Sequence, residues 1–358
     1  MDENKEDNNN QEFLPKSEPN TVSSIDDSAL NDDTKDLEFK NRLDLSELQH
    51  SVSKIRAEVG KVIVGQKDMV DMLIASLLAK GHSLIEGVPG VAKTVTAKLL
   101  AKSLSVGFSR IQFTPDLMPS DILGTSVFNL KDSEFEFKKG PIFSNMILID
   151  EINRAPAKTQ AALFEVMEEQ QITIDGHKYI LDTPFMVLAT QNPVEQEGTY
   201  RLPEAQLDRF LFKIDVDYPN LEEEIEILSR EHDLKEGTKT EKITSFLTAT
   251  QIANYQNLVN QVIVEKHLLK YIAELIVATR SNRFLYLGAS PRASISVLKA
   301  SKAFAAMNGR DFVTPEDIKR AVIPVLHHRV IVTPEREMEG VTSKQIINQI
   351  IETVEIPR

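Results

Sequence analysis

A loop of small residues, a lysine and a pair of acids have the types and the spacing that phosphate chemistry needs. The loop runs Gly-Val-Pro-Gly-Val-Ala-Lys-Thr over residues 87–94, between a short apolar run and a stretch of helical character. Small residues let backbone N–H groups converge on phosphate oxygens, and a helix N-terminus adds partial positive charge. Lys93 would bridge the β- and γ-phosphates, and Thr94 would place its hydroxyl on Mg²⁺. The pattern predicts a nucleotide-binding loop made of Gly87, Val88, Pro89, Gly90, Val91, Ala92, Lys93, Thr94 and Val95.

One position departs from the generic phosphate-loop pattern. Glycine usually precedes the lysine, and this chain has Ala92 there. A methyl group suits a helix start, so we expect the loop to tolerate it. A plain Gly/Pro turn that leaves Lys93 in solvent is the alternative, and the order of strand, loop and helix disfavours it.

The two acids follow a second apolar run. Asp150 and Glu151 come directly after Met146–Ile149, and in open α/β sheets ligands bind at the carboxyl ends of the strands. Asp150 would complete the Mg²⁺ shell, and Glu151 would be the general base that polarises a water for attack on the γ-phosphate. Alone, such a pair is better explained as a solvated turn. Together with the loop, it predicts ATP hydrolysis.

The elements that must position these residues alternate in type up to Asp217. Short apolar runs are typical of strands covered on both faces, and helical segments between them predict a parallel α/β sheet. The predicted strands are Ser83–Glu86, Ser109–Phe113, Met146–Ile149, Phe185–Ala189 and Leu211–Val216, with helices at Thr94–Leu104 and Lys158–Gln170.

After Tyr218-Pro219 the strand signal fades. Thr314-Pro315 followed by two acids is a typical helix start, because it combines a capping hydroxyl, a proline at the first position and charges that complement the dipole. The sequence predicts an α/β domain over residues 43–217 and a small all-helical domain over 218–358. The predicted helices of the second domain are Glu222–Glu231, Gln251–Val262, Lys266–Thr279, Ala293–Met307 and Glu316–Leu326.

Composition limits the class of protein. The 358 residues carry a formal net charge of −13, and most of the acidic excess lies in the polar residues 1–42, which we predict to be a disordered tail.

No run approaches a membrane span, and the N-terminus does not resemble a secretory signal. The chain has no cysteine, which suits a reducing compartment, and we expect a cytoplasmic protein. The absence of a strong basic excess disfavours non-specific nucleic-acid binding. The seven histidines show no zinc spacing, and His327 and His328 are interpreted as structural.

Four strings of residues together resemble the MoxR family of AAA+ ATPases over about residues 44–335. They are the phosphate loop, Asp-Glu-Ile-Asn-Arg-Ala at 150–155, Ala-Thr-Gln-Asn-Pro at 189–193 and Leu-Pro-Glu-Ala-Gln-Leu-Asp-Arg-Phe at 202–210. Ala92 is the usual residue in this family. The resemblance implies a P-loop NTPase fold with a five-stranded parallel sheet and a small all-helical lid, ATP and Mg²⁺ as ligands, and a homo-oligomeric, hexameric ring.

The resemblance also implies roles for single residues. Asn192 matches the sensor 1 residue that orients the attacking water, although Asn192-Pro193 also fits a plain turn. Arg209 matches the arginine finger, with a surface ion pair to Asp208 or Glu204 as the alternative.

Arg292 matches sensor 2, at the first turn of a helix where a cation opposes the dipole unless an anion lies near it. That anion could be the γ-phosphate or a glutamate. Arg154 and Arg201 are weaker candidates for contacts between subunits, and the resemblance places Val64, Gly65 and Gln66 beside the adenine.

Two alternating segments predict hairpins. Ile172–Ile180 contains Asp-Gly, the strongest short hairpin signal, and matches the pre-sensor hairpin of this clade. Val127–Leu130 and Phe135–Phe137 match the insert in helix 2. In relatives such hairpins face the ring pore or a bound partner, and packing on their own domain is the alternative.

The role implied by the resemblance is chaperone-like remodelling, maturation or metal insertion in protein complexes, often beside a partner with a von Willebrand factor A domain. A chelatase-type motor subunit and a DNA-acting AAA+ protein are the two alternatives. The complete set of Lys93, Asp150 and Glu151 argues against an inactive ATPase, and no Gly-Ala-Phe-Thr-Gly-Ala loop of the transcription activators is present. The client protein cannot be named from the sequence.

Overall fold

A computed structural model describes residues 43–131, 133–192, 200, 202–233 and 245–356. The predicted acidic tail, residues 1–42, lies outside the described residues, as do Pro193 and Arg201. None of the described helices combines the length and the apolar character that a bilayer span needs.

A five-stranded sheet in the order β10-β1-β9-β6-β3 forms the centre of the first domain, and every neighbouring pair in it is parallel. Its strands end within two residues of the predicted ones, so the predicted α/β sheet is confirmed. They are β1 (Ser83–Gly87), β3 (Phe108–Gln112), β6 (Met146–Asp150), β9 (Met186–Gln191) and β10 (Phe212–Val216).

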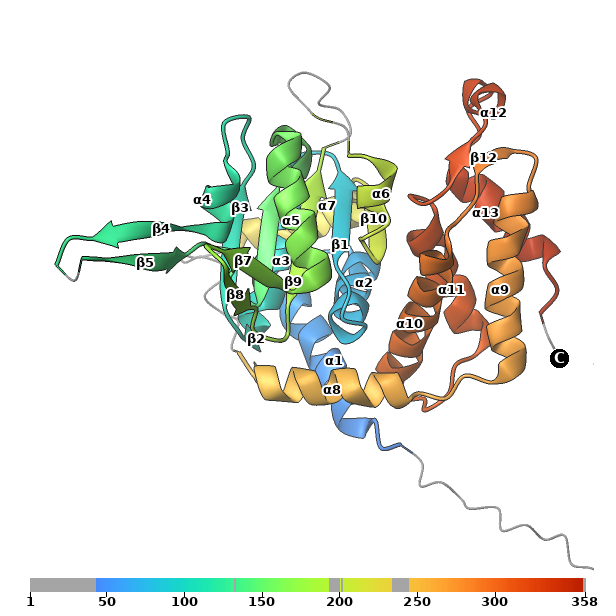
Figure 1. Cartoon of the computed structure of the whole chain (residues 1–358). Coiled ribbons are helices and arrows are strands. Elements are labelled where there is room, and N and C mark those ends of the chain that lie inside the picture. The colour runs from blue at the N-terminus through green and yellow to red at the C-terminus, as the bar shows by residue number, and fades with distance from the viewer. Residues whose placement is uncertain (1–42, 132, 193–199, 201, 234–244, 357–358) are drawn as a thin grey trace, which may run out of the picture. The chain divides into compact units, whose positions relative to one another are not determined.

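The central strands are apolar throughout because they are covered on both faces. In β6, Met146 and Leu148 belong to one hydrophobic cluster while Ile147 and Ile149 belong to another. This alternation has the period of two that strand geometry requires. The first cluster takes in helices α1 (Ser46–Gly60), α2 (Lys67–Leu78) and α3 (Lys93–Ser103), and the second takes in α5 (Ala157–Glu169). Figure 1 shows α5 lying across the sheet.

Shorter elements decorate this domain. The two predicted hairpins are present as antiparallel pairs, β4 with β5 and β7 with β8. The remaining bounds are β2 (Leu104–Ser105), α4 (Pro119–Leu123), β4 (Gly124–Asn129), β5 (Glu134–Lys139), the 3₁₀ turn η1 (Ile152–Arg154), β7 (Gln171–Ile174), β8 (His177–Ile180) and α6 (Glu204–Leu207).

The second domain is helical, and its predicted helices are confirmed to within two residues at each end. They are α7 (Leu221–His232), α8 (Ala249–Gln261), α9 (Lys266–Ser281), α10 (Pro291–Met307) and α11 (Pro315–Leu326), followed by α12 (Pro334–Met338) and α13 (Ser343–Thr353), which were not predicted.

The prediction of an all-helical domain needs a correction. Two short strands, β12 (Leu285–Leu287) and β13 (Ile331–Val332), pair antiparallel within the lid. A third, β11 (Leu247–Thr248), pairs in parallel with β2 of the first domain. Strands of two or three residues are too short for a period of two to be visible in the sequence.

The lid packs on the same hydrophobic cluster that covers the α1 face of the sheet. Phe304 of α10 stacks on Phe212 of β10 with ring centroids 6.0 Å apart, and both side chains are fully buried. Residues 42–358 accordingly form one compact unit. The boundary at 217/218 remains a prediction from the sequence.

Candidate functional site

The phosphate loop connects the end of β1 to the start of α3, as the sequence predicts. Gly87 lies so close to β10 that a Cβ atom there would meet the carbonyl oxygen of Val216 at 2.6 Å. Gly90 adopts φ +90°, which a side chain would strain. The loop therefore needs glycine at both positions for steric reasons.

Ala92 occupies a left-handed conformation, with φ 60° and ψ 19°, immediately before α3. The expectation of a methyl group at a helix start is wrong in detail, because Ala92 lies just outside the helix at its N-cap. A left-handed alanine costs about 1–2 kcal/mol relative to a right-handed one, whereas glycine would adopt it freely. The loop accommodates alanine with some strain.

A cavity of about 330 Å³ opens in front of this loop. At its floor the hydroxyl of Thr94 donates to Oδ1 of Asp150 at 3.1 Å, and Asp150 is only 5% exposed. Lys93 donates to the main-chain carbonyl of Gly87, so its ammonium group curls back over the loop. Nine of the predicted site residues line the cavity: Pro89, Gly90, Ala92, Lys93, Thr94, Val95, Asp150, Glu151 and Asn192.

Glu151 leaves the sheet in a left-handed conformation, with φ 58°. Its backbone N–H donates to Oγ1 of Thr190 at 3.1 Å, which joins it to the neighbouring strand β9. Its carboxylate accepts from Nε2 of Gln112 at 2.8 Å and pairs with Arg154 at 3.2 Å. Arg154, a weak candidate for contacts between subunits, therefore contacts the predicted general base of its own chain.

Four residues of this cavity were not predicted from the sequence: Arg110, Gln112, Thr190 and Gln191. Arg110 donates from Nε to Oδ2 of Asp150 at 2.6 Å. The pairing of β3 with β6 accounts for the position of Arg110 and Gln112 in the cavity. Gln112 at the end of β3 lies opposite Asp150 at the end of β6. Polar residues at the carboxyl ends of parallel strands converge on the same edge.

The donors at the floor of the cavity fit Mg²⁺. This cation prefers oxygen ligands and binds through one or two carboxylates together with phosphate groups. Thr94 and Asp150 offer a hydroxyl and a carboxylate whose oxygens are already in contact.

Two of the three predicted adenine residues line a different cavity, of about 670 Å³, which α1, α2 and α7 border. Val64 and Gly65 line it together with Arg56 and Arg230. Gln66 donates from Nε2 to the main-chain carbonyl of Asp217 at 3.1 Å. The role of these residues beside adenine remains a prediction.

Arg209 and Arg292 line a third cavity, and within the described residues neither lines the one at the phosphate loop. Both pair with the same carboxylate, Glu168 at the end of α5. Arg209 also donates to the main-chain carbonyl of Phe164 at 3.2 Å. Burial lowers the pKa of the Arg209 guanidinium, and the charge of Arg292 lowers it further.

The ion pairs of Arg209 and Arg292 bear on the alternatives raised by the sequence, and the finger and sensor 2 roles remain predictions. The anion beside Arg292 in this structure is a glutamate, and Arg209 pairs with Glu168 rather than with Asp208 or Glu204. Asp208 instead binds Arg329, with 2.6 Å between Oδ1 and Nε.

Comparisons with known proteins agree with the fold. A family described as "ATPase family associated with various cellular activities (AAA)" matches residues 82–212, and the AAA lid domain matches residues 277–350. Chaperone MoxR1 of Mycobacterium tuberculosis is 41% identical over 318 residues, which cover 86% of this chain and 83% of that protein. The chain belongs to the MoxR family of AAA+ ATPases.

Two further proteins support this assignment. The MoxR-family chain is 44% identical to YeaC of Bacillus subtilis over 311 residues, which cover 87% of this chain and 96% of YeaC. A crystal structure of a candidate ATPase from Cytophaga hutchinsonii matches with a TM-score of 0.81 at 44% identity, covering 88% and 97% of the two chains. The predicted family, fold class and ATPase activity are confirmed.

The hairpin β4–β5 of this MoxR-family ATPase presents apolar side chains to solvent. Leu130 is 85% exposed and Phe135 is 74% exposed, and Phe135 contacts Phe128 edge-on across the hairpin. The base of this hairpin packs on the other one, because the rings of Phe137 and Tyr179 lie 4.4 Å apart. Apolar residues at a protruding tip are typical of a surface that contacts another protein.

Proposed function

We propose that the cavity at the phosphate loop is where this MoxR-family protein hydrolyses ATP, and that turnover drives chaperone-like remodelling, maturation or metal insertion in protein complexes. The single observation that carries the proposal is the contact of Thr94 with Asp150 at 3.1 Å, with Glu151 and Lys93 in the same cavity. A hydroxyl, two carboxylates and a lysine are the side chains that phosphoryl transfer to water uses in P-loop NTPases.

The chain's own residues divide the work. Lys93 neutralises charge on the β- and γ-phosphates, and the loop amides cradle them. Glu151 accepts a proton from the water whose oxygen attacks the γ-phosphorus, while Asn192 orients that water. The bond from the γ-phosphorus to its bridging oxygen breaks, and ADP and phosphate are the products. Mg²⁺, held by Thr94 and Asp150, would neutralise charge on the phosphate oxygens.

The arginines imply a second subunit. Arg209 and Arg292 lie on a separate cavity of their own chain, so a neighbouring copy is needed to bring them to the γ-phosphate. A ring of identical subunits, six by family resemblance, would satisfy this requirement. Val64, Gly65 and Gln66 would contact the adenine.

We assign the partner surface to the exposed tip of β4–β5 and place the protein in the cytoplasm, with a von Willebrand factor A protein as its partner. Replacing Phe128 and Phe135 with serine should leave ATP turnover unchanged and abolish remodelling, because both side chains are remote in sequence from the loop and partly exposed. Remodelling at the original rate would contradict this assignment.

A chelatase-type motor would instead need its own chelatase subunits, and a DNA-acting protein would show ATP turnover stimulated by DNA.

Measurement of ATP turnover tests the site. Lys93→Ala should abolish hydrolysis, and Lys98→Ala, an exposed lysine on the same helix, is the matched control. Glu151→Gln should bind ATP without cleaving it, with turnover reduced about 10²–10⁴-fold, as expected for loss of a general base. Retained turnover in either site variant would refute the assignment. The Glu151→Gln protein would also be suitable for trapping the client.

A further inference from the structure

Arg329 is a buried cation that lies just after α11 and has no part in the chemistry described above. Its side chain is only 2% exposed. Burial lowers the pKa of its guanidinium to about 10, an effect that the nearby carboxylate of Asp208 opposes. A buried charge is costly unless it is paired and hydrogen-bonded, so its partners are informative.

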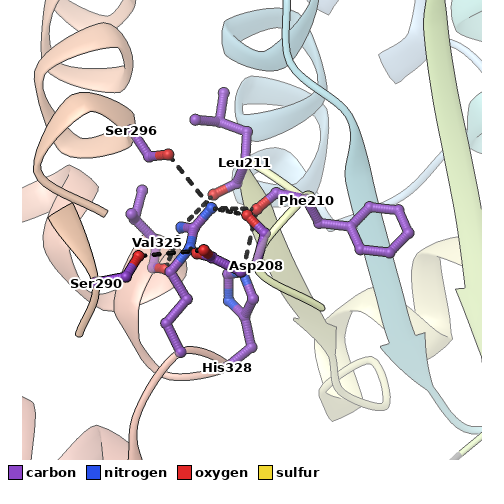
Figure 2. A network of polar contacts seen from close by, with 8 residues as sticks. Asp208, Phe210, Leu211, Ser290, Ser296, Val325 and His328 are labelled. Carbon is purple, nitrogen blue, oxygen red and sulfur yellow. Dashed lines mark hydrogen bonds and ion pairs between the residues drawn. The ribbon is translucent and has the colours of Figure 1, made fainter. Parts of the chain in front are cut away.

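Three of those partners, Asp208, Phe210 and Leu211, flank Arg209 in the sequence, and Figure 2 shows them around the guanidinium. The Nε of Arg329 donates to Oδ1 of Asp208 at 2.6 Å. Its terminal N–H groups donate to the main-chain carbonyls of Asp208 at 3.0 Å, Phe210 at 2.6 Å and Leu211 at 3.3 Å. We call residues 208–211 the finger segment. One side chain thus fixes the backbone immediately before and immediately after Arg209.

The same guanidinium also holds the lid. It donates to the main-chain carbonyl of Val325 at 2.5 Å and to Oγ of Ser296 on α10 at 3.3 Å. His328 adds a contact of 3.2 Å from Nε2 to the carbonyl of Phe210. The finger segment is therefore bound to α10 and α11 through a network of short polar contacts (Figure 2).

Ser290 supplies a separate line of evidence. It stands at the N-cap of α10, where a serine hydroxyl normally accepts a bond from the helix's own N–H groups, but it makes no such bond. Its hydroxyl instead donates to Oδ2 of Asp208 at 3.1 Å. Arg292 lies two residues further along. The helix start that carries one arginine is thus attached to the segment that carries the other.

We propose that Arg329 is a positioning residue for the pair Arg209 and Arg292, holding the finger segment and the start of α10 as one rigid body. This inference rests on the proposed function, in which both arginines act on the nucleotide of a neighbouring subunit. In consequence the lid does not move independently of the finger segment, and any displacement of the lid moves Arg209 with it.

Arg329→Lys tests the proposal, because lysine keeps the charge and loses the planar fork that reaches several carbonyls. We expect kcat for ATP hydrolysis to fall about 10²-fold, the usual effect of a misplaced reacting group. The KM for ATP and the affinity for a non-hydrolysable analogue should be unchanged, because Arg329 is remote from the phosphate loop cavity. In a background that lacks both arginines, Arg209→Ala combined with Arg292→Ala, the same change should cause no further loss.

Two further variants provide a matched control and a second test of the network. Arg310→Lys is the matched control: Arg310 forms a two-pronged pair with Asp317 within the lid, with both N–O distances 2.7 Å, and its replacement should leave kcat unchanged. Ser290→Ala removes one contact of the network and should lower kcat roughly 2- to 10-fold, the effect of one hydrogen bond. If the Arg329→Lys protein does not fold, the kcat of Ser290→Ala tests the proposal in its place.

The outcomes separate this inference from the proposed function. If Arg209→Ala itself leaves turnover intact, the finger assignment is wrong. If Arg209→Ala abolishes turnover while Arg329→Lys and Ser290→Ala do not reduce kcat, only the positioning role is wrong. Equal losses in Arg329→Lys and Arg310→Lys, or a further loss when Arg329→Lys is added to the variant that lacks both Arg209 and Arg292, would identify Arg329 as a general structural residue and overturn the proposal.

Discussion

Arg110 donates to the carboxylate of Asp150 at 2.6 Å, so the acid proposed to hold Mg²⁺ is paired with a cation from the neighbouring strand. The arginine side chain is 56% exposed, whereas that of Asp150 is 7% exposed. Mg²⁺ and the guanidinium would therefore compete for the same carboxylate.

Removal of this competitor should favour the metal. Partly exposed ion pairs are worth about 0.2–1 kcal/mol, so Arg110→Ala should lower the Mg²⁺ concentration for half-maximal ATP turnover roughly 1.5- to 5-fold. A titration of turnover with MgCl₂ measures this, with Lys98→Ala as the control. A higher Mg²⁺ requirement would mean that Arg110 assists phosphate binding instead.

The left-handed Ala92 predicts a stabilising substitution. Ala92→Gly should relieve about 1–2 kcal/mol of backbone strain, part of which is offset because glycine makes the unfolded chain more flexible. We expect a rise in Tm of about 1–3 °C by calorimetry without nucleotide. Ala161→Gly, at an exposed position of α5 with ordinary helical geometry, is the control and should lower Tm. A fall in Tm for Ala92→Gly would show that the loop holds the alanine without strain.

Separation of the arginines from the phosphate loop predicts complementation between subunits. Arg209→Ala should reduce kcat about 10³–10⁵-fold, as the loss of other arginine fingers does. Lys93→Ala should be equally inactive. A mixture of the two inactive proteins should regain turnover, because some interfaces then combine an intact loop with an intact finger. No recovery at any mixing ratio, under conditions where the subunits exchange, would place Arg209 outside the neighbour's site.

His82 predicts sensitivity to acid. Its Nδ1 accepts from the backbone N–H of Val187 at 3.0 Å and its Nε2 lies 3.1 Å from the carbonyl of Met167, an arrangement that requires the neutral ring. Burial lowers its pKa from 6.5 to about 4.

Because the folded pKa lies below the unfolded one, the unfolded chain takes up the proton first as the pH falls. The stability contributed by neutral His82 is complete above about pH 6.5 and is lost progressively between about pH 6.5 and 4. The free energy of unfolding should fall by about 1.4 kcal/mol per pH unit there. His82→Gln should flatten this slope in urea titrations, and His177→Gln, on an exposed hairpin, should not. An identical slope in His82→Gln would exclude His82 as the cause.

The sequence predicted the five strands of the central sheet, the phosphate loop and both hairpins because each depends on local patterns. Helix α13 was missed although Thr342 and Gln345 form a capping box there, and Ile346 and Ile350 follow at helical spacing. This local pattern is sufficient to predict the helix.

Other features depend on which residues meet in space. Arg110 reaches Asp150 only through the pairing of β3 with β6, and Glu168 meets both Arg209 and Arg292 across 41 and 124 residues of chain. Long-range contacts of this kind leave no local pattern. The conformation of Ala92 was also hidden, because the sequence shows the residue type and not the dihedral angle.

Phe212 in the sheet and Phe304 in the lid belong to one continuous hydrophobic cluster, which also includes α1 and α2. A fragment that ends after β10 would expose the lid-facing part of this cluster, and a fragment that begins at α7 would expose the rest. The sheet domain and the lid, which two separate family descriptions match, are therefore expected to unfold in a single calorimetric transition. Neither half is a suitable expression fragment on its own.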